Sequence, residues 1–218
     1  QPAAEGLKTV HRFMIGGHAA QCKGANLSLA LGDRDTSPYL AVMPHWTAPI
    51  SNNGPWPMTL SVGDTLPQAT LATPSPDGPK PITTDELFKG KTVALFAVPG
   101  AFTPTCSARH LPGYVDNGAA LKAKGVDTIA CIAVNDPFVM AAWAESQSVG
   151  ADEVLMLADG SGDFTRTLGL TLDARGFGMG ERSQRYSMLV KDGKVIELNI
   201  ESGGEFKVSS AEHLLAQL

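Results

Sequence analysis

Three apolar runs stand out in the pattern of hydrophobic and polar positions, at residues 93–98, 128–134 and 154–157. The first two contain almost no polar residue, and the second is rich in β-branched side chains. Uninterrupted runs of this length, bounded by turn residues, are typical of strands buried on both faces, as in a parallel sheet. We therefore predict a buried strand at each of the three runs.

Helix-start and helix-stop signals lie between these runs. Residues 82–90 hold Thr83 or Thr84 as a cap, an acidic first turn and a final Gly90. Further short helices are predicted over residues 107–111, 119–124, 138–144 and 164–168. Strands that alternate with helices in this way indicate an α/β fold with right-handed crossovers.

The last third of the chain changes character. Residues 186–190 and 195–200 are strand-like runs joined by Lys-Asp-Gly-Lys, and Asp-Gly between such runs is a strong hairpin signal. A closing helix over residues 211–218 is preceded by serines that can cap it. Because a hairpin adds antiparallel strands, we expect a thioredoxin-like fold with a central mixed β-sheet flanked by helices.

The first part of the chain has no sustained periodicity. Residues 1–56 mix Gly, Ser, Asn and Pro freely and are interpreted as an irregular N-terminal extension, with the folded domain over residues 57–218. Nine of the fifteen prolines fall between Pro44 and Pro81, and proline disfavours helix at its own position and at the one before. This span is predicted to be linker and loop, with one strand over residues 69–72.

Charge and composition exclude several classes of partner. The 218 residues are 43% hydrophobic and 18% charged, as in ordinary globular proteins. The net charge is −5 and no block of Lys and Arg occurs, which argues against nucleic acid or an anionic membrane as partner. No apolar stretch approaches the roughly 18 residues that a membrane span needs. We expect a soluble protein.

The three cysteines, Cys22, Cys106 and Cys131, are odd in number and share no spacing, which fits neither a disulfide framework nor a zinc site. His18 lies four residues before Cys22, but two ligands in an irregular extension make a poor metal site. We therefore predict no metal and a reducing compartment. The expected location is cytoplasmic, with the mitochondrion or a plastid as the alternative if the extension is a targeting segment.

Cys106 is the main candidate for chemistry. It follows the apolar run 93–98 and the turn Pro-Gly-Ala-Phe-Thr-Pro-Thr, so it should lie where a strand passes into a helix. Amide N–H groups and the positive end of the helix dipole favour a thiolate at such a position. The commoner alternative for a lone cysteine is a buried structural role.

The residues around Cys106 resemble a known family. Pro-Gly-Ala-Phe-Thr-Pro-Thr-Cys-Ser at 99–107, His-Leu-Pro-Gly-Tyr at 110–114 and Val-Asn-Asp-Pro-Phe at 134–138 are similar to the type II, or peroxiredoxin-5, subfamily of peroxiredoxins. The resemblance runs from Leu60 to the C-terminus. It implies a thiol-specific peroxidase that reduces hydrogen peroxide and organic hydroperoxides in antioxidant defence and redox homeostasis, without a metal or organic cofactor.

The same resemblance assigns roles to individual residues. It makes Cys106 the peroxidatic cysteine, Thr103 the hydroxyl that hydrogen-bonds the peroxide and the thiolate, and Arg185 the active-site guanidinium. The supporting loop comprises Pro99, Gly100, Pro104 and Thr105. A fixed cation beside the sulfur also stabilises negative charge on the departing oxygen. Arg182 is the weaker candidate for this cation and is expected to be a solvated loop charge.

Two routes can resolve the sulfenic acid that forms. Some members of the subfamily carry a resolving cysteine in the loop after the hairpin, where this chain has Ser209. Cys131 is then the candidate resolving cysteine, but its place in a buried strand favours a structural role. We therefore expect an external thiol, either glutathione with glutaredoxin or thioredoxin. By resemblance we also expect a homodimer formed through the face near the active site.

Two other functions fit parts of the pattern. A redox sensor needs only an exposed reactive thiol, whereas the combination of Thr103, Cys106 and Arg185 favours catalysis. A Cys–His hydrolase would pair Cys106 with His110, but no orienting Asn or Asp is evident in the sequence. A packing or capping role is therefore expected for His110.

Overall fold

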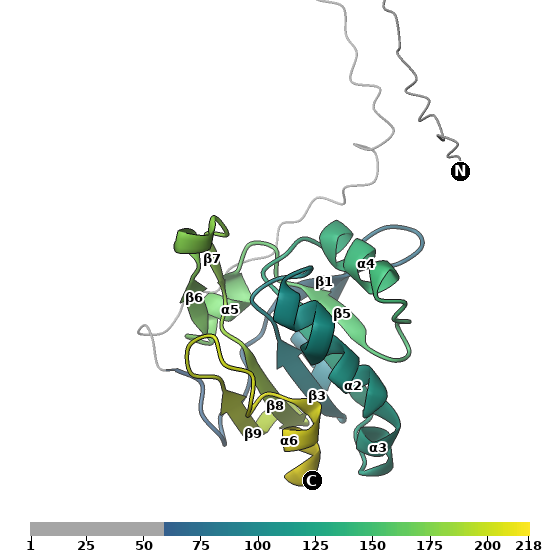
Figure 1. The fold of residues 1–218 in the computed structure, drawn as a ribbon. Coiled ribbons are helices and arrows are strands. Elements are labelled where there is room, and N and C mark those ends of the chain that lie inside the picture. Colours follow the sequence, from purple (N-terminus) through teal and green to yellow (C-terminus); the bar gives the residue numbers. More distant parts are fainter. Residues whose placement is uncertain (1–58) are drawn as a thin grey trace, which may run out of the picture. The chain divides into compact units, whose positions relative to one another are not determined.

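A seven-stranded sheet forms the centre of residues 59–218, the part of the chain that the computed structural model describes (Figure 1). Its strand order is β2-β1-β5-β4-β3-β8-β9. The strands are β1 (Thr70–Thr73), β2 (Lys80–Thr83), β3 (Thr92–Ala97), β4 (Thr128–Ala133), β5 (Leu155–Ala158), β8 (Tyr186–Lys191) and β9 (Lys194–Ile200). The predictions for residues 1–56, including those for His18 and Cys22, lie outside the described residues.

The sheet is mixed, as predicted. β3, β4 and β5 are parallel to one another, and the other neighbouring strands pair antiparallel. The three apolar runs of the sequence form these three parallel strands. Because the carboxyl ends of parallel strands lie at one edge of a sheet, the loops that follow β3 and β4 are neighbours there.

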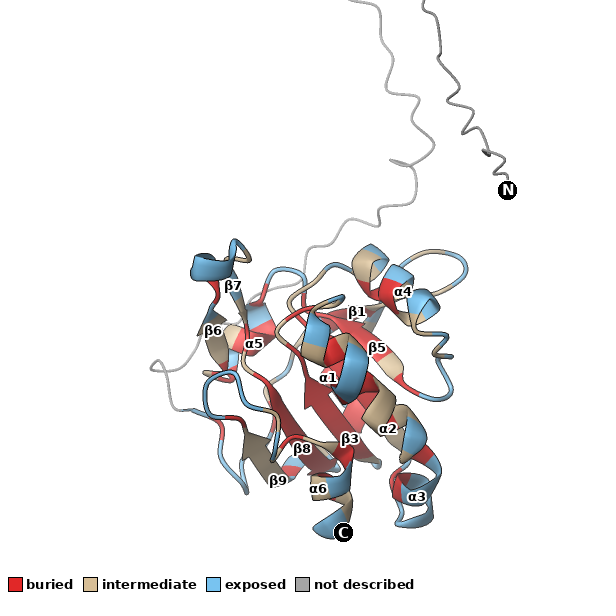
Figure 2. Cartoon of the chain, viewed as in Figure 1, coloured by how far each residue is buried: buried red, intermediate tan, exposed pale blue. Residues whose placement is uncertain are grey.

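Helices cover both faces of the sheet. One face packs against α2 (Leu111–Asp116), α3 (Gly118–Ala123), α4 (Pro137–Ser146) and α6 (Ala211–Ala216). The other packs against α1 (Thr84–Phe88) and α5 (Asp163–Thr167). The central strands between these layers are buried (Figure 2). Within residues 59–218, no helix is long and apolar enough to cross a membrane.

The central strand β3 is apolar from Val93 to Ala97 because both of its faces are covered. Ala94 and Phe96 belong to the hydrophobic cluster on the α2 side, whereas Val93 and Leu95 belong to the cluster on the α1 side. All four are fully buried. Since successive side chains of a strand point to opposite faces, a polar residue of β3 is found only at its partly buried first position, Thr92.

The structure contains the helix caps and the hairpin turn that local sequence signals predict. Thr83 caps α1: its hydroxyl accepts the amide N–H of Glu86 at 3.2 Å, and the Glu86 carboxylate accepts the Thr83 amide at 2.7 Å. The β8–β9 hairpin turns at Asp192 and Gly193, with φ of 50° and 78°. Positive φ at both positions is typical of a tight two-residue turn. Ser210 caps the closing helix α6.

The interpretation of residues 44–81 as linker and loop with a single strand is incomplete. β2 is a second strand and contains Pro81. β2 lies at the edge of the sheet, where the missing proline N–H costs no ladder hydrogen bond. The structure also adds a small hairpin of β6 (Thr171–Asp173) and β7 (Glu181–Ser183) around the 3₁₀ turn η3 (Arg175–Phe177). Strands of three residues are too short to show periodicity.

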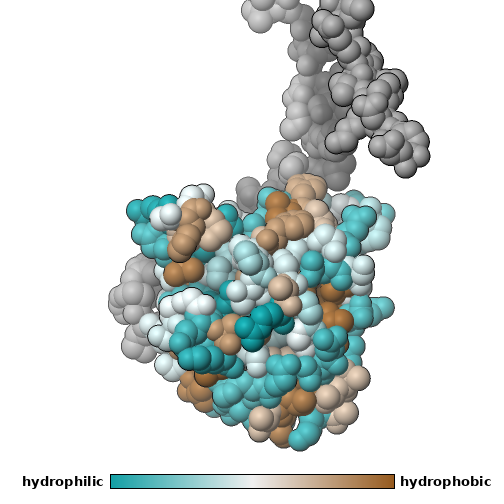
Figure 3. Space-filling view, in the orientation of Figure 1, coloured by the Kyte–Doolittle hydropathy of each residue, from teal (hydrophilic) through white to brown (hydrophobic). Residues whose placement is uncertain are grey.

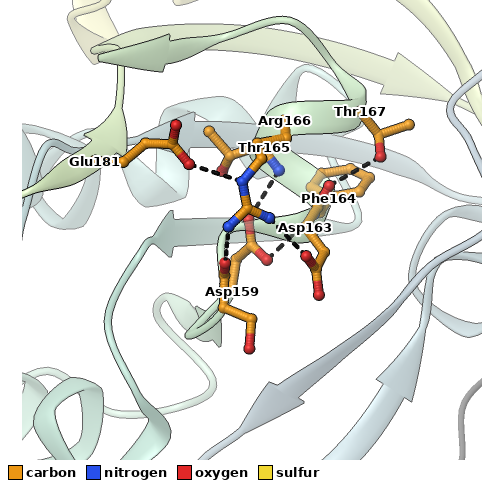
Figure 4. Close-up of polar contacts among 8 residues, drawn as sticks. Asp159, Asp163, Phe164, Thr165, Arg166, Thr167 and Glu181 are labelled. Carbon is orange, nitrogen blue, oxygen red and sulfur yellow. Dashed lines mark hydrogen bonds and ion pairs between the residues drawn. The ribbon is translucent and has the colours of Figure 1, made fainter. Parts of the chain in front are cut away.

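A network of polar side chains joins α5 to β7 (Figure 4). Arg166 Nε donates to Glu181 Oε1 at 2.7 Å, its Nη1 donates to Asp163 Oδ1 at 2.6 Å, and its Nη2 donates to the carbonyl of Ser161. Asp159, just after β5, accepts two amide N–H groups at the start of α5. These contacts hold β7 in place, and β7 leads directly into β8.

Candidate active site

Cys106 lies where the chain passes from β3 into a helix, as predicted. Helical backbone begins at Pro104, and Cys106–His110 form a π-helical segment, η2, in which the amide of Leu111 donates to the Cys106 carbonyl. π-helical turns are rare and occur frequently at functional sites. Cys106 and His110 are both fully buried. Both side chains therefore face the interior of the domain.

The register of the sheet brings Arg185 to Cys106. β8 pairs with β3 so that Tyr186 lies opposite Ala97, which places the preceding residue beside the loop that leaves β3. Arg185 Nη1 lies 3.4 Å from Cys106 Sγ and 3.1 Å from His110 Nδ1. One NH₂ group of the guanidinium thus has a hydrogen for each acceptor. Arg185 is only 9% exposed, so its charge acts on the sulfur with little screening by water.

His110 uses both of its ring nitrogens. Nε2 lies 3.1 Å from the carbonyl oxygen of Ser209, which can only accept, so Nε2 carries the hydrogen and Nδ1 accepts from Arg185. Burial, together with the charge of Arg185, lowers the pKa of His110 to about 3 and keeps the ring neutral at physiological pH. His110 therefore holds the guanidinium of Arg185. Within residues 59–218 no hydrogen bond pairs His110 with Cys106, so the hydrolase alternative lacks its dyad.

The loop between β3 and η2 is held by one hydrogen bond within the loop and by one to the loop after β4. The Thr103 hydroxyl donates to the Gly100 carbonyl at 2.8 Å and keeps its lone pairs as acceptors. The Ala101 amide donates at 3.0 Å to Oδ1 of Asn135, in the loop after β4. Among the described residues, no hydrogen bond joins Thr103 to Cys106. The rest of the predicted loop consists of Pro99, Pro104 and Thr105.

An aromatic ring from the loop between β9 and α6 covers the site. The ring centroid of Phe206 lies 5.0 Å from that of His110 and 5.8 Å from the Arg185 guanidinium carbon. The guanidinium carbon of Arg109 lies 4.8 Å from the same centroid. Phe206 thus lies near both the buried Arg185 and the exposed Arg109, and it can attract both cations through its π face.

Arg182 is not the solvated charge that we expected. Its Nε donates to the Met179 carbonyl at 2.8 Å and its Nη1 donates to the Val134 carbonyl at 2.6 Å, with the side chain half-buried. Arg182 therefore ties β7 to the end of β4. Of the two arginines, Arg185 is the one that the fold brings to Cys106.

The part of the chain that forms this site is similar to known proteins. A family model described as Redoxin matches residues 61–215. The Oryza sativa subsp. japonica protein Peroxiredoxin-2E-2, chloroplastic, is 52% identical over 164 residues, which are 73% of each chain. Peroxiredoxin-2E, chloroplastic, from Arabidopsis thaliana is 47% identical over 198 residues, 88% of this chain and 82% of the relative. The chain belongs to the peroxiredoxin family, in its type II branch.

Solved structures agree with this assignment. The structure of reduced Prx3 from Vibrio vulnificus in complex with H₂O₂ has a TM-score of 0.70 and 54% sequence identity, and the match covers 73% of this chain and 99% of that one. The predicted thioredoxin-like fold is confirmed. As a peroxiredoxin, the protein is a thiol peroxidase that acts in antioxidant defence. In residues 59–218, no group of three or more His, Cys, Asp or Glu residues is arranged to hold a metal.

The second described cysteine of this peroxiredoxin is a core residue. Cys131 lies opposite Phe96 in the β3–β4 pairing and is fully buried. Burial raises the pKa of the Cys131 thiol well above its ordinary value. A thiol held in its neutral form in an apolar environment is a poor nucleophile.

Several residues of the site gave no signal in the sequence of this peroxiredoxin. The pattern at residues 135–137 indicates a helix start, which Asp136 does cap, but it does not predict the contact of Asn135 with the loop after β3. Phe206 and the Ser209 carbonyl lie far from Cys106 in sequence and belong to no motif around it. Backbone carbonyls in particular carry no sequence signature.

Proposed function

We propose that Cys106 is the peroxidatic cysteine of this peroxiredoxin, with Arg185 and Thr103 as its catalytic partners. The observation that carries the proposal is the 3.4 Å approach of Arg185 Nη1 to Cys106 Sγ. A guanidinium stays protonated at any physiological pH, so it offers the sulfur a permanent positive charge. Pro99, Gly100, Pro104 and Thr105 shape the loop that presents these groups.

The proposed step is attack of the Cys106 thiolate on the terminal oxygen of a hydroperoxide. The S–O bond forms as the O–O bond breaks, the sulfur is oxidised to a sulfenic acid, and the leaving oxygen takes a proton from water to become water or an alcohol. Arg185 stabilises the negative charge that moves from sulfur to the leaving oxygen. The Thr103 hydroxyl, which donates to Gly100, accepts the O–H of the peroxide.

Peroxide consumption with a thiol donor tests these roles. Cys106→Ser should abolish turnover, and Arg185→Lys should slow the oxidation of Cys106 by about tenfold to a hundredfold, since a lysine cannot serve both acceptors from one planar group. Cys131→Ser is the matched control and should retain turnover. Turnover by the folded Cys106→Ser variant would show that another group carries the reaction.

We further propose that an external thiol resolves the sulfenic acid, with glutathione and glutaredoxin favoured over thioredoxin. A groove of about 440 Å³ lies beside the site, between α2 and the loop before α6. The groove is lined by two cations and two carboxylates, from Arg109, Lys207, Asp116 and Glu212. Glutathione carries two carboxylates and one ammonium group, so it has a charge of the opposite sign for each kind of side chain. In the described part of the chain Arg109 makes no ion pair, so its guanidinium is available to a carboxylate.

A steady-state comparison of the two reducing systems tests this choice. Arg109→Ala should raise the KM for glutathione severalfold, whereas Lys80→Ala, which changes an exposed cation on the edge strand β2, should leave it unchanged. Turnover with thioredoxin alone, and none with glutathione and glutaredoxin, would contradict the preference.

We also propose a homodimer that forms through the face near the active site. Phe102 and Phe138 follow β3 and β4 and are 55% and 61% exposed. Figure 3 shows hydrophobic side chains at this end of the domain, near α4 and β7, and others on its right side and along its lower edge. Exposed aromatic residues at one edge are typical of an interface. Sedimentation should show a dimer that Phe138→Glu converts to a monomer; a monomeric wild type would contradict the proposal.

For location we propose a plastid, one of the alternatives to the cytoplasm raised by residues 1–56. The relatives named above as chloroplastic support it, and the match to the Arabidopsis thaliana relative covers 88% of this chain. We retain residues 1–56 as an extension outside the domain at 57–218. Fractionation of cells that express the protein, followed by immunodetection, tests the location, and a purely cytosolic signal would contradict it.

A further inference from the structure

Glu201 is a buried carboxylate with no part in the peroxide chemistry described so far. It follows β9 and is only 6% exposed. Its Oε1 accepts three hydrogen bonds, from the Lys207 amide at 2.6 Å and from the amide and hydroxyl of Ser209, both at 2.8 Å. The amide of Glu201 itself donates to the Arg185 carbonyl at 2.9 Å. Glu201 thus joins the backbone of Arg185 to the loop of residues 202–210.

The loop of residues 202–210, which Glu201 holds, contacts His110, the residue that accepts a hydrogen bond from Arg185. The Ser209 carbonyl accepts the Nε2–H of His110 at 3.1 Å and also the hydroxyl of Tyr114 at 3.1 Å. The other nitrogen of His110 accepts from Arg185. Phe206, in the same loop, lies against the His110 ring. A displacement of this loop would therefore move His110 and release the guanidinium.

We propose that Glu201 is a positioning residue for the peroxide step: by clamping Ser209 it fixes His110 in its Nε2–H tautomer and so holds Arg185 against the sulfur of Cys106. This inference rests on the proposed roles of Cys106 and Arg185. Glu201 touches no reacting atom and acts only through these intermediaries.

The chemistry of a carboxylate suits this position. One oxygen meets three donors, and an ionised acceptor forms stronger hydrogen bonds than a neutral one. Burial raises the pKa of Glu201, but the hydrogen bonds from Ser209 and Lys207 outweigh burial and lower the pKa below its ordinary value. The side chain is therefore ionised at neutral pH.

Three variants of the full chain test the proposal. Glu201→Leu removes the acceptor and Glu201→Gln replaces it with a neutral one. Glu205→Gln is the matched control, since it changes an exposed carboxylate of the same loop. Stopped-flow tryptophan fluorescence times two steps separately: oxidation of Cys106 by hydrogen peroxide, and reduction of its sulfenic acid by dithiothreitol. Only a positioning role predicts a change confined to the first step.

We expect Glu201→Leu to slow oxidation about tenfold and Glu201→Gln about threefold, because hydrogen bonds to a charged group are lost or weakened. The reduction step and the Glu205→Gln variant should match wild type. Wild-type oxidation in Glu201→Gln, or a parallel fall of both steps, overturns the proposal. If Glu201→Leu does not fold, Glu201→Gln alone decides.

Cys106→Ser, measured beside these variants, tests the proposed function separately. Residual turnover in Cys106→Ser overturns the role of Cys106. Normal oxidation in the Glu201 variants, with Cys106→Ser inactive, overturns only the role of Glu201.

Discussion

Acid should destabilise this peroxiredoxin through His110, and His110→Gln should remove that part of the pH dependence. The ring is fully buried and donates to a carbonyl on one side while it accepts from Arg185 on the other. A proton on Nδ1 would remove the acceptor and place a second positive charge beside the guanidinium. Glutamine keeps a neutral polar side chain that does not titrate.

The size of the effect follows from the two pKa values of His110. In the folded protein the pKa is lowered to about 3, whereas an unfolded chain takes up the proton below about pH 6.5. Between these values the unfolded state binds more protons. The stability that His110 contributes is therefore fully present well above pH 6.5 and falls as pH decreases, with a slope that approaches about 1.4 kcal/mol per pH unit below about pH 5.5. At pH 6.5 the unfolded ring is already half protonated, so the further loss from pH 6.5 to 4.5 amounts to about 2 kcal/mol.

Urea unfolding of wild type and His110→Gln, at several pH values from about 4.5 to 7.5, measures this loss directly. Other titrating groups, such as Glu201 and Asp159, are present in both proteins and cancel in the difference. The free energy of unfolding of wild type minus that of the variant should fall by about 2 kcal/mol between pH 6.5 and 4.5. Parallel pH profiles would refute the argument that the folded protein excludes the proton from His110.

Three further substitutions separate packing from chemistry. Cys131→Ala should keep peroxide turnover per folded molecule and lower Tm, because it deletes a fully buried sulfur; lost turnover would indicate a resolving role. Asn135→Ala removes the acceptor of the Ala101 amide and should cost about 1 kcal/mol of unfolding free energy, with slower oxidation of Cys106 in stopped-flow traces. Asp136→Ala removes the cap of α4 and should cost about 1 kcal/mol of unfolding free energy, measured in urea. The rate of Cys106 oxidation should be unchanged in this variant; a loss of rate as large as that of Asn135→Ala would link α4 to the chemistry.

Short-range signals in the sequence were sufficient for most of the fold. The apolar run of β3 predicts a strand covered on both faces, Thr83 and Glu86 predict the start of α1, and Asp192-Gly193 predicts the β8–β9 turn. Each of these depends on residues a few positions apart, so local backbone preference and polarity are enough. Segments with weaker local signals, such as β2 and the β6–β7 hairpin, depend on pairing and could not be predicted this way.

The sequence by itself determined that Cys106 sits at the junction of a buried strand and a helix, in a loop typical of peroxiredoxins. Only the tertiary structure decided what surrounds its sulfur. Arg185 reaches Cys106 because β8 pairs with β3 in one register, and His110 is held by a carbonyl 99 residues further along the chain. Contacts over such separations are set by strand order and loop packing, which no local pattern encodes.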